Sequence, residues 1–285
     1  MLEIEDLHVR LGRRTVLDGI SLQARAGEVL AICGANGAGK STLLKAVLGE
    51  VPATGRVRLN GYNVAQTRLS DLARIRAVLP QDTEVAFTFT LGEIVAMGLE
   101  AGDFFDRPEV LTEALHAVGL AGHTDHTFHT LSGGERQRGQ LARALAQVWG
   151  PVGPQGPRWL LLDEPVASLD LGHQLQVMRL ARGFADAGGG VVAVMHDLNL
   201  SAMFADRIAF LIDGRLSAIG PPSIVLTPHL LERAYGCRIA LNGIPTKEPW
   251  ILPQTCEASA GDGGHNVLSI YPLSADSRTD SRFPT

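Results

Sequence analysis

The chain has 285 residues, of which 45% are apolar and 19% charged, and its formal net charge is −5 at pH 7. This composition is that of an ordinary globular protein and excludes a disordered one, and the acidic balance leaves no basic footprint for binding nucleic acid. Three cysteines without a CxxC pair favour a reducing compartment over a disulfide framework. The N-terminal residues alternate and include acids, and no stretch approaches the ~20 apolar residues of a membrane span. We therefore expect a soluble, cytoplasmic chain without a signal peptide.

The first strong motif is "GANGAGKST", residues 34–42, which follows the predicted strand Val29–Cys33 and opens the helical run "STLLKAVLG". A glycine-rich turn between a strand and a helix lets backbone N–H groups converge on a phosphate, and the helix dipole adds to the attraction. We expect Lys40 to reach the β- and γ-phosphates and Ser41 to ligate Mg²⁺. The predicted nucleotide-binding residues of this phosphate loop are Gly34, Ala35, Asn36, Gly37, Ala38, Gly39, Lys40, Ser41 and Thr42.

Three further apolar runs, Ala77–Leu79, Trp159–Leu162 and Val191–Met195, predict parallel strands. They run into Gln81, into Asp163 with Glu164, and into His196, so these side chains should meet the phosphate loop at one edge of the sheet. We expect Asp163 to hold Mg²⁺ and Glu164 to take a proton from the attacking water. Gln81 can bond Mg²⁺ or that water, and His196 can donate to the γ-phosphate. Alternatively, Gln81 and His196 only cap strands.

The remaining elements predict an α/β protein. Residues 90–147 contain helical patterns and no convincing strand, which indicates an inserted helical subdomain. "WGPVGPQGPRW" reads as a loop, and Ile208–Ile212 and Arg215–Ala218 flank a "DG" turn typical of a hairpin. We predict an α/β core with a β subdomain over 1–89 and 148–253, and a polar, disordered tail over 254–285.

With "LSGGERQ" at residues 131–137, "WLLLDEP", "SLD" and "MHD", the motifs resemble, in order, those of ABC-transporter ATPases, which have a P-loop NTPase (RecA-like) core. The resemblance covers residues 1–250. It implies that Ser132, Gly133, Gly134 and Glu135 of one subunit bind the ATP held by the phosphate loop of a second copy, with Ser168, Leu169 and Asp170 lining the shared interface. Locally, Ser132 and Glu135 also fit a helix-capping box.

The resemblance further implies a homodimer on the cytoplasmic face of the inner membrane, bound peripherally to integral-membrane permease subunits and linked indirectly to a periplasmic or surface substrate-binding protein. Residues 196–236 resemble the ATPases of ferric siderophore, haemin and cobalamin importers, and the insert before "WLLLDEP" is similar to that of haemin-import ATPases; a siderophore or cobalamin importer is the alternative. The absence of a second module or internal repeat disfavours a soluble, non-transport ABC ATPase, and "LSGGE" disfavours a P-loop kinase.

The sequence departs from the family's pattern at Leu11, where an aromatic residue usually stacks on adenine, which predicts only a modest preference for ATP over GTP. Cys33 could make activity thiol-sensitive or be a small buried apolar residue. The histidines of "HTDHTFH" (123–129) could form a metal site but fit a solvated loop better. Phe87 and Phe89 could contact the permease or pack in the core.

Overall fold

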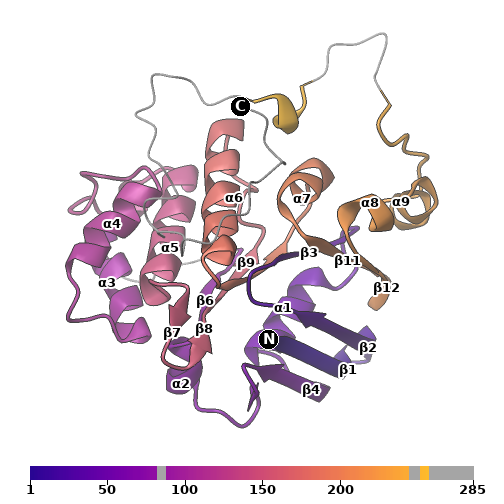
Figure 1. Cartoon of the computed structure of the whole chain (residues 1–285), viewed down its shortest axis with the longest axis horizontal. Coiled ribbons are helices and arrows are strands. Elements are labelled where there is room, and N and C mark those ends of the chain that lie inside the picture. The colour runs from indigo at the N-terminus through magenta and orange to yellow at the C-terminus, as the bar shows by residue number, and fades with distance from the viewer. Residues whose placement is uncertain (82–87, 244–250, 257–285) are drawn as a thin grey trace.

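The computed structural model describes residues 1–81, 88–243 and 251–256. A six-stranded sheet lies at its centre, with strands in the order β12-β11-β3-β10-β9-β6. Strands β11 to β6 run parallel, and β12 pairs antiparallel with β11 at the edge. Figure 1 shows α6 and α7 on one face of this sheet and α1 on the other. The strands are β3 (Val29–Gly34), β6 (Arg76–Leu79), β9 (Trp159–Asp163), β10 (Gly190–Val194), β11 (Arg207–Ile212) and β12 (Arg215–Gly220).

The parallel strands are buried on both faces, because helices or a second sheet cover each side. All residues of β9 and β10 are buried. Side chains alternate between two cores: Leu160 and Leu162 pack with the helices α3 to α7, whereas Leu161 packs with α1 and the N-terminal strands. This alternation explains why the strands read as uninterrupted apolar runs in the sequence.

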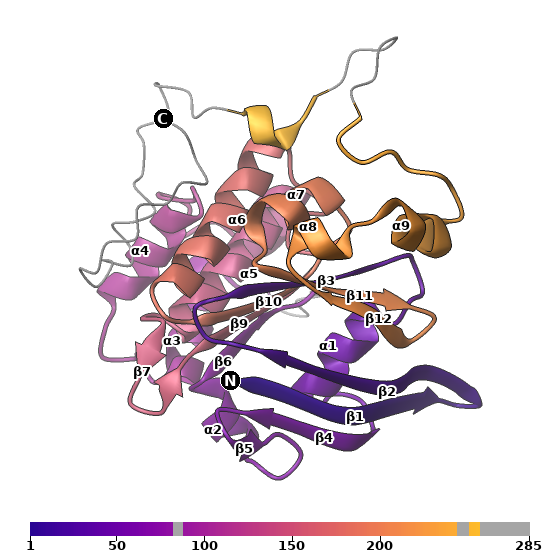
Figure 2. The same cartoon turned by 45° about the vertical axis from the view of Figure 1, so that its right-hand side comes forward.

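A separate four-stranded antiparallel sheet has the order β2-β1-β4-β5 and packs over α1, as Figure 2 shows. Its strands are β1 (Leu2–Leu11), β2 (Arg14–Ala24), β4 (Ala53–Leu59) and β5 (Tyr62–Asn63). The helix α1 (Lys40–Leu48) is thus enclosed between two sheets. Its first residue is the lysine of the phosphate loop, so packing of both sheets on α1 fixes that loop.

The helices are α2 (Leu69–Ala73), α3 (Leu91–Gly102), α4 (Glu109–Ala117), α5 (Gly133–Gln147), α6 (Leu171–Asp186), α7 (Leu198–Phe204), α8 (Pro222–Val225) and α9 (Pro228–Tyr235), with 3₁₀ turns at Phe128–Thr130 and Pro253–Thr255. Helices α3, α4 and α5 form a group beside the sheet (Figure 1). Within residues 90–147 they are joined by loops and one isolated bridge between Thr90 and Thr127. The division into domains at these residues stays a prediction.

Two local expectations differ in outcome. The hairpin at the "DG" turn is present, with Asp213 and Gly214 both at positive φ (49° and 74°), the backbone that a tight two-residue hairpin turn requires. The segment 149–159, predicted as a loop, is only partly so: β7 (Val152–Gly153) and β8 (Gly156–Pro157) form a small antiparallel pair. The sequence did not predict this strand pair, because the prolines and glycines of the segment are typical of turns and loops. Most of the predicted tail, residues 257–285, lies outside the described residues.

Candidate functional site

The phosphate loop lies between β3 and α1 and accepts only glycine at its ends. At Gly34, φ is +151° and a Cβ atom would lie 2.3 Å from the backbone oxygen of Leu211 on the neighbouring strand. At Gly39, φ is +98° and a Cβ would lie 2.7 Å from Leu17 of β2. Gly34 is therefore enclosed by the parallel sheet and Gly39 by the antiparallel sheet. Because neither position has room for a side chain, the surrounding chain fixes the shape of the loop.

Lys40 is 5% exposed, and its ammonium group donates to the carbonyl oxygens of Gly34 (3.0 Å) and Ala35 (3.1 Å) within the loop. Burial lowers the pKa of this lysine, and the nearby carboxylates of Glu164 and Asp163 oppose the shift. Among the described residues, the hydrogen-bond partners of this buried cation are carbonyls of its own loop, so it is well placed to exchange them for phosphate oxygens. This geometry fits the predicted contact with a nucleotide.

Ser41 and Asp163 meet beside the loop, with the Ser41 hydroxyl donating to Asp163 Oδ1 at 3.0 Å. Asp163 ends β9 and is 5% exposed; burial raises the pKa of its carboxyl, and the Ser41 hydrogen bond opposes the shift. Hydroxyl and carboxylate oxygens are the donors that Mg²⁺ prefers, and a cation would offset the unfavourable burial of the carboxylate. The pair therefore fits the predicted metal. Gln81 is also predicted as a ligand; its amide nitrogen donates to Glu164 Oε2, and the ligand role of its amide oxygen stays a prediction.

Glu164 follows Asp163, and its carboxylate is hydrogen-bonded to a side chain at the end of each neighbouring strand. The Gln81 amide, just after β6, donates to Glu164 Oε2 at 3.1 Å. The Nε2 atom of His196, just after β10, bonds Glu164 Oε1. The ends of three strands thus bring Gln81, Glu164 and His196 together, as the sequence predicted, because β9 lies between β6 and β10.

The loop Leu131–Glu135, here called the signature loop, lies at the start of α5 in the helical group, not on the sheet edge. Ser132 Oγ accepts from the Glu135 backbone N–H (3.3 Å), and Glu135 accepts from the Ser132 N–H (2.8 Å). The capping box is therefore present, and these bonds from Ser132 lower the pKa of Glu135. A Cβ added at Gly133 would meet no atom within 4 Å, so this loop is open to the outside.

The loop Ser168–Asp170, here called the interface loop, lies against the signature loop of the same chain. A Cβ at Gly134 would lie 3.3 Å from Leu169 Cδ2 and 3.5 Å from the Ser168 oxygen. Asp170 caps α6 by accepting from the backbone N–H of His173 at 3.0 Å, which also lowers the pKa of Asp170. The two loops that the resemblance assigns to a dimer interface therefore share one surface.

Comparison with known proteins decides the family. The family model described as ABC transporter matches residues 17–167, which include the phosphate loop, the signature loop and the Asp163–Glu164 pair. The chain belongs to the ABC transporter ATPase family. The ABC ATPase is thus an ATP-binding, ATP-hydrolysing enzyme with the predicted α/β P-loop fold.

Several curated relatives match over almost the whole ABC ATPase. The hemin import ATP-binding protein HmuV of Roseobacter denitrificans is 52% identical and the alignment covers 88% of this chain and 97% of that protein. The proteins of the same name from Jannaschia sp. and Rhizobium meliloti are both 50% identical, covering 92% and 90% of this chain and 97% and 99% of theirs.

Solved structures agree on the fold. An ATP-binding subunit of an ABC transporter superposes with a TM-score of 0.71 at 24% identity, covering 84% of this chain and 95% of that one. A dimeric ATP-binding cassette in a post-hydrolysis state, bound to ADP and Pi, has a TM-score of 0.67 at 25% identity, covering 78% and 99%. No helix in the described part of this ABC ATPase is long and apolar enough to cross a membrane.

The structure adds contacts that sequence reasoning missed. Gln137, in the second turn of α5, donates from its side-chain amide to the backbone oxygen of Glu164 at 3.1 Å. Gln174 of α6 donates to the backbone oxygen of Leu169 in the interface loop (3.0 Å) and to that of Val166, just before the loop (3.2 Å). A helical glutamine carries no sequence signal of such a role, because its partner is a backbone atom of a distant segment.

The structure also describes the surroundings of Cys33, of the histidines in 123–129, of Phe89 and of Leu11. Cys33 is fully buried, its thiol donates to Ser201, and burial raises its pKa to about 11, so it is a small buried apolar residue and the thiol-sensitivity hypothesis loses its basis. The rings of His123 and His126 lie with centroids 4.8 Å apart and their planes tilted by 45°. Phe89 is half-buried against the core, and Phe87 lies outside the described residues. Leu11 is 49% exposed at the end of β1.

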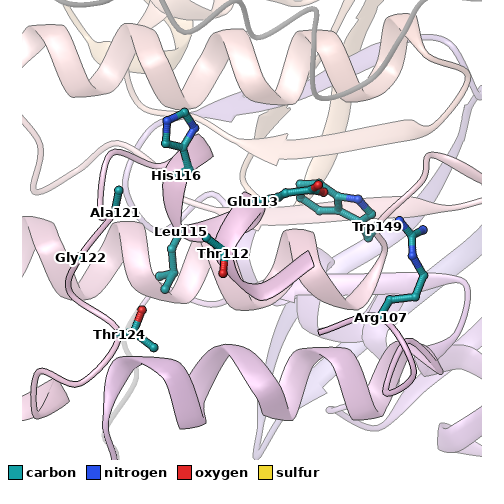
Figure 3. A pocket seen from close by; sticks show the side chains of 9 residues that line it. All are labelled: Arg107, Thr112, Glu113, Leu115, His116, Ala121, Gly122, Thr124 and Trp149. Carbon is teal, nitrogen blue, oxygen red and sulfur yellow. The ribbon is translucent and has the colours of Figure 1, made fainter. Parts of the chain in front are cut away.

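The helical group also contains a pocket of about 510 Å³ around α4 (Figure 3). Its lining includes Arg107, Glu113, His116 and Trp149. None of the residues that line it belongs to the predicted nucleotide site, so this pocket is separate from the ATP-binding edge of the sheet.

Proposed function

We propose that the chain is the energy-coupling ATPase of a haemin importer. The observation that carries this proposal is the set of relatives named for hemin import, which are 50–52% identical over 88–92% of the chain. The ABC ATPase works as a homodimer, binds ATP with Mg²⁺, and is attached peripherally to the cytoplasmic face of the inner membrane through separate permease subunits. A substrate-binding protein outside that membrane delivers the cargo to the permease.

In this mechanism the phosphate loop binds the ATP phosphates through its backbone N–H groups and through Lys40, which leaves the carbonyls it now contacts. Ser41 and Asp163, whose side-chain oxygens lie 3.0 Å apart, would hold Mg²⁺, and the cation would neutralise charge on the phosphates. Gln81 and His196 flank Glu164 and orient it, and His196 can turn to donate to the γ-phosphate. Glu164 then takes a proton from the attacking water.

The second copy supplies the missing donor groups. The open Gly133 and the neighbouring Ser132 and Gly134 bind the γ-phosphate of the ATP held by the partner's phosphate loop. Contact between the signature loop and the interface loop within one chain supports a common dimer surface. ATP binding closes this dimer, closure moves the permease, and hydrolysis reopens it.

The catalytic part of the proposal is tested with Glu164→Gln. The amide retains the size of the side chain but is not a base, so we expect turnover to fall at least ~100-fold while ATP binding persists. Turnover is followed by phosphate release, and binding by fluorescence of a labelled ATP. A variant that hydrolyses ATP within a few-fold of the wild type would remove Glu164 from the role of general base.

The cargo is tested by growth of a deletion strain with haemin as sole iron source and, in parallel, with a ferric siderophore. Loss of growth on haemin alone, restored by the wild-type gene but not by Glu164→Gln, is the expected result. Loss of growth on the siderophore instead would identify the siderophore as the cargo of the importer. Loss of cobalamin uptake would identify cobalamin. Growth unaffected in every condition, with the protein absent from the membrane fraction, would favour a non-transport ABC ATPase.

A further inference from the structure

The backbone at Glu164 is held in an unfavourable conformation. Its φ is +52°, in the left-handed region that residues with a side chain rarely adopt. The next residue is Pro165, and a residue before proline is driven towards extended backbone instead. Such a conformation persists only where neighbouring groups fix it. The aim of the Glu164 carboxylate therefore depends on what holds its backbone.

Among the described residues, three hydrogen bonds hold this backbone. The Glu164 N–H donates to the carbonyl oxygen of Val194 on β10 (3.2 Å). The Glu164 carbonyl oxygen accepts from the N–H of Ala167 (3.3 Å), within the same turn, and from the side-chain amide of Gln137 (3.1 Å). Of these donors and acceptors, Gln137 alone belongs to the helical group, on the helix α5 that begins at the signature loop.

The amide of Gln137 has one role among the described residues. Its Nε2 atom makes the bond to Glu164, whereas its Oε1 atom is buried without a hydrogen-bond partner. A buried oxygen without a partner is unfavourable for folding, so the residue is not optimised for stability at this position. An apolar side chain of the same length would remove that oxygen together with the bond to Glu164.

We propose that Gln137 is a positioning residue for hydrolysis, which fixes the peptide after Glu164 and so ties the aim of its carboxylate to the signature helix of the same chain. The inference rests on the proposed role of Glu164 as the general base. Because α5 begins at the signature loop, engagement of that loop by the partner's nucleotide is passed to Glu164 through this hydrogen bond. Gln137 does not touch the nucleotide.

The test compares Gln137→Met with Gln176→Met in the full-length protein. Gln176 of α6 makes the same kind of bond, from its amide to the backbone oxygen of Ala117 (2.9 Å), away from the ATP-binding edge, and is the matched control. For Gln137→Met we expect kcat to fall roughly 10- to 100-fold, since misplacement by about 1 Å costs this order of rate. KM for ATP and the melting temperature should stay near wild type. Gln176→Met should retain kcat.

Wild-type kcat in Gln137→Met would overturn the inference, and so would loss of folding in both Gln137→Met and Gln137→Glu, because the residue would then be structural. In Gln137→Glu the ionised carboxylate cannot donate to the Glu164 carbonyl, so kcat should fall at least as far. Glu164→Gln in the same assay separates the two proposals. If Glu164→Gln is inactive and Gln137→Met is fully active, the role of Glu164 stands and the role of Gln137 does not.

Discussion

The two glycine-containing loops of this protein are built in opposite ways. The phosphate loop is enclosed: Gly34 touches the backbone of the adjacent strand, Gly39 touches β2, and Lys40 is buried. The signature loop is open: Gly133 faces no atom within 4 Å, and its backbone is an ordinary helix start with a capping box. Both present N–H groups and a hydroxyl, but only the first is shaped by the chain itself.

This difference indicates where each loop finds its ligand. An enclosed loop is preorganised for a phosphate within its own subunit, because the sheets and helix around it fix its backbone donors. An exposed loop without strain has room for a group brought by another molecule. In the proposed homodimer that group is the nucleotide of the second copy.

The largest expected effect is that of Gly34→Ala. The added methyl would lie 2.3 Å from the Leu211 backbone oxygen, and neither strand can move without breaking the sheet. We expect loss of about 2–4 kcal/mol of unfolding free energy, in the range of overpacking together with backbone strain, and loss of ATP binding. Thermal unfolding and nucleotide titration check it. A variant with wild-type stability would mean that the loop is not enclosed as described.

The matched change in the open loop, Gly133→Ala, should behave differently. The methyl enters free space at the first turn of α5, where alanine favours the helix, so stability should be unchanged or slightly higher. ATP binding should persist, but hydrolysis should fall at least about tenfold, because the methyl would separate the loop from the partner's phosphate. Steady-state turnover at saturating ATP measures it.

Mixing provides the control for this second change. Gly133→Ala and Lys40→Ala should each hydrolyse ATP much more slowly than wild type, but a mixed dimer combines one intact phosphate loop with one intact signature loop. Recovery of part of the activity on mixing is expected. Failure to recover, with dimers demonstrably formed, would contradict a nucleotide shared between subunits.

A smaller effect is expected on the thermal stability of the ligand-free protein when Asp163 is replaced. Burial raises the pKa of Asp163, so its ionised form destabilises the fold at neutral pH. Asp163→Asn retains an acceptor for Ser41 and should melt at a higher temperature than wild type without Mg²⁺ or nucleotide, while losing Mg²⁺-dependent hydrolysis. The difference in melting temperature should shrink as pH falls through the raised pKa of the folded state and vanish only below the unfolded-state value of 3.8, where the carboxyl is protonated in both states. If Asp163→Asn were less stable than wild type at pH 8, the ionised Asp163 carboxylate would not destabilise the fold.

The smallest expected effect is at the edge of the nucleotide site. Leu11 is exposed at the end of β1, and a tyrosine there could stack on adenine. Stacking contributes about 0.5–1.5 kcal/mol, so Leu11→Tyr should tighten ATP binding roughly 2- to 10-fold. Titration with ATP and GTP measures affinity and base preference. Unchanged affinity would place the base away from Leu11.

Much of the candidate site was predictable, because its residues follow local signals. Gln81, Glu164 and His196 each come directly after an apolar strand, and parallel strands place such residues at one edge. Gln137 was not predictable as a contact of Glu164, although it is the last residue of the motif "LSGGERQ". Its bond is to a backbone atom 27 positions away, and a helical glutamine looks the same whether or not it makes such a bond.

Local sequence signals were enough to predict the elements: the phosphate loop between strand and helix, the acidic pair at a strand end, the capped start of α5 and the family to which they belong. These follow from short-range preferences of glycine, apolar alternation and helix caps. Tertiary structure alone decided that β10 lies between β3 and β9, that Glu164 takes a left-handed backbone, and that α5 reaches its carbonyl. Those facts depend on packing between segments far apart in the chain, where many arrangements satisfy the same local pattern and only the complete set of contacts selects one.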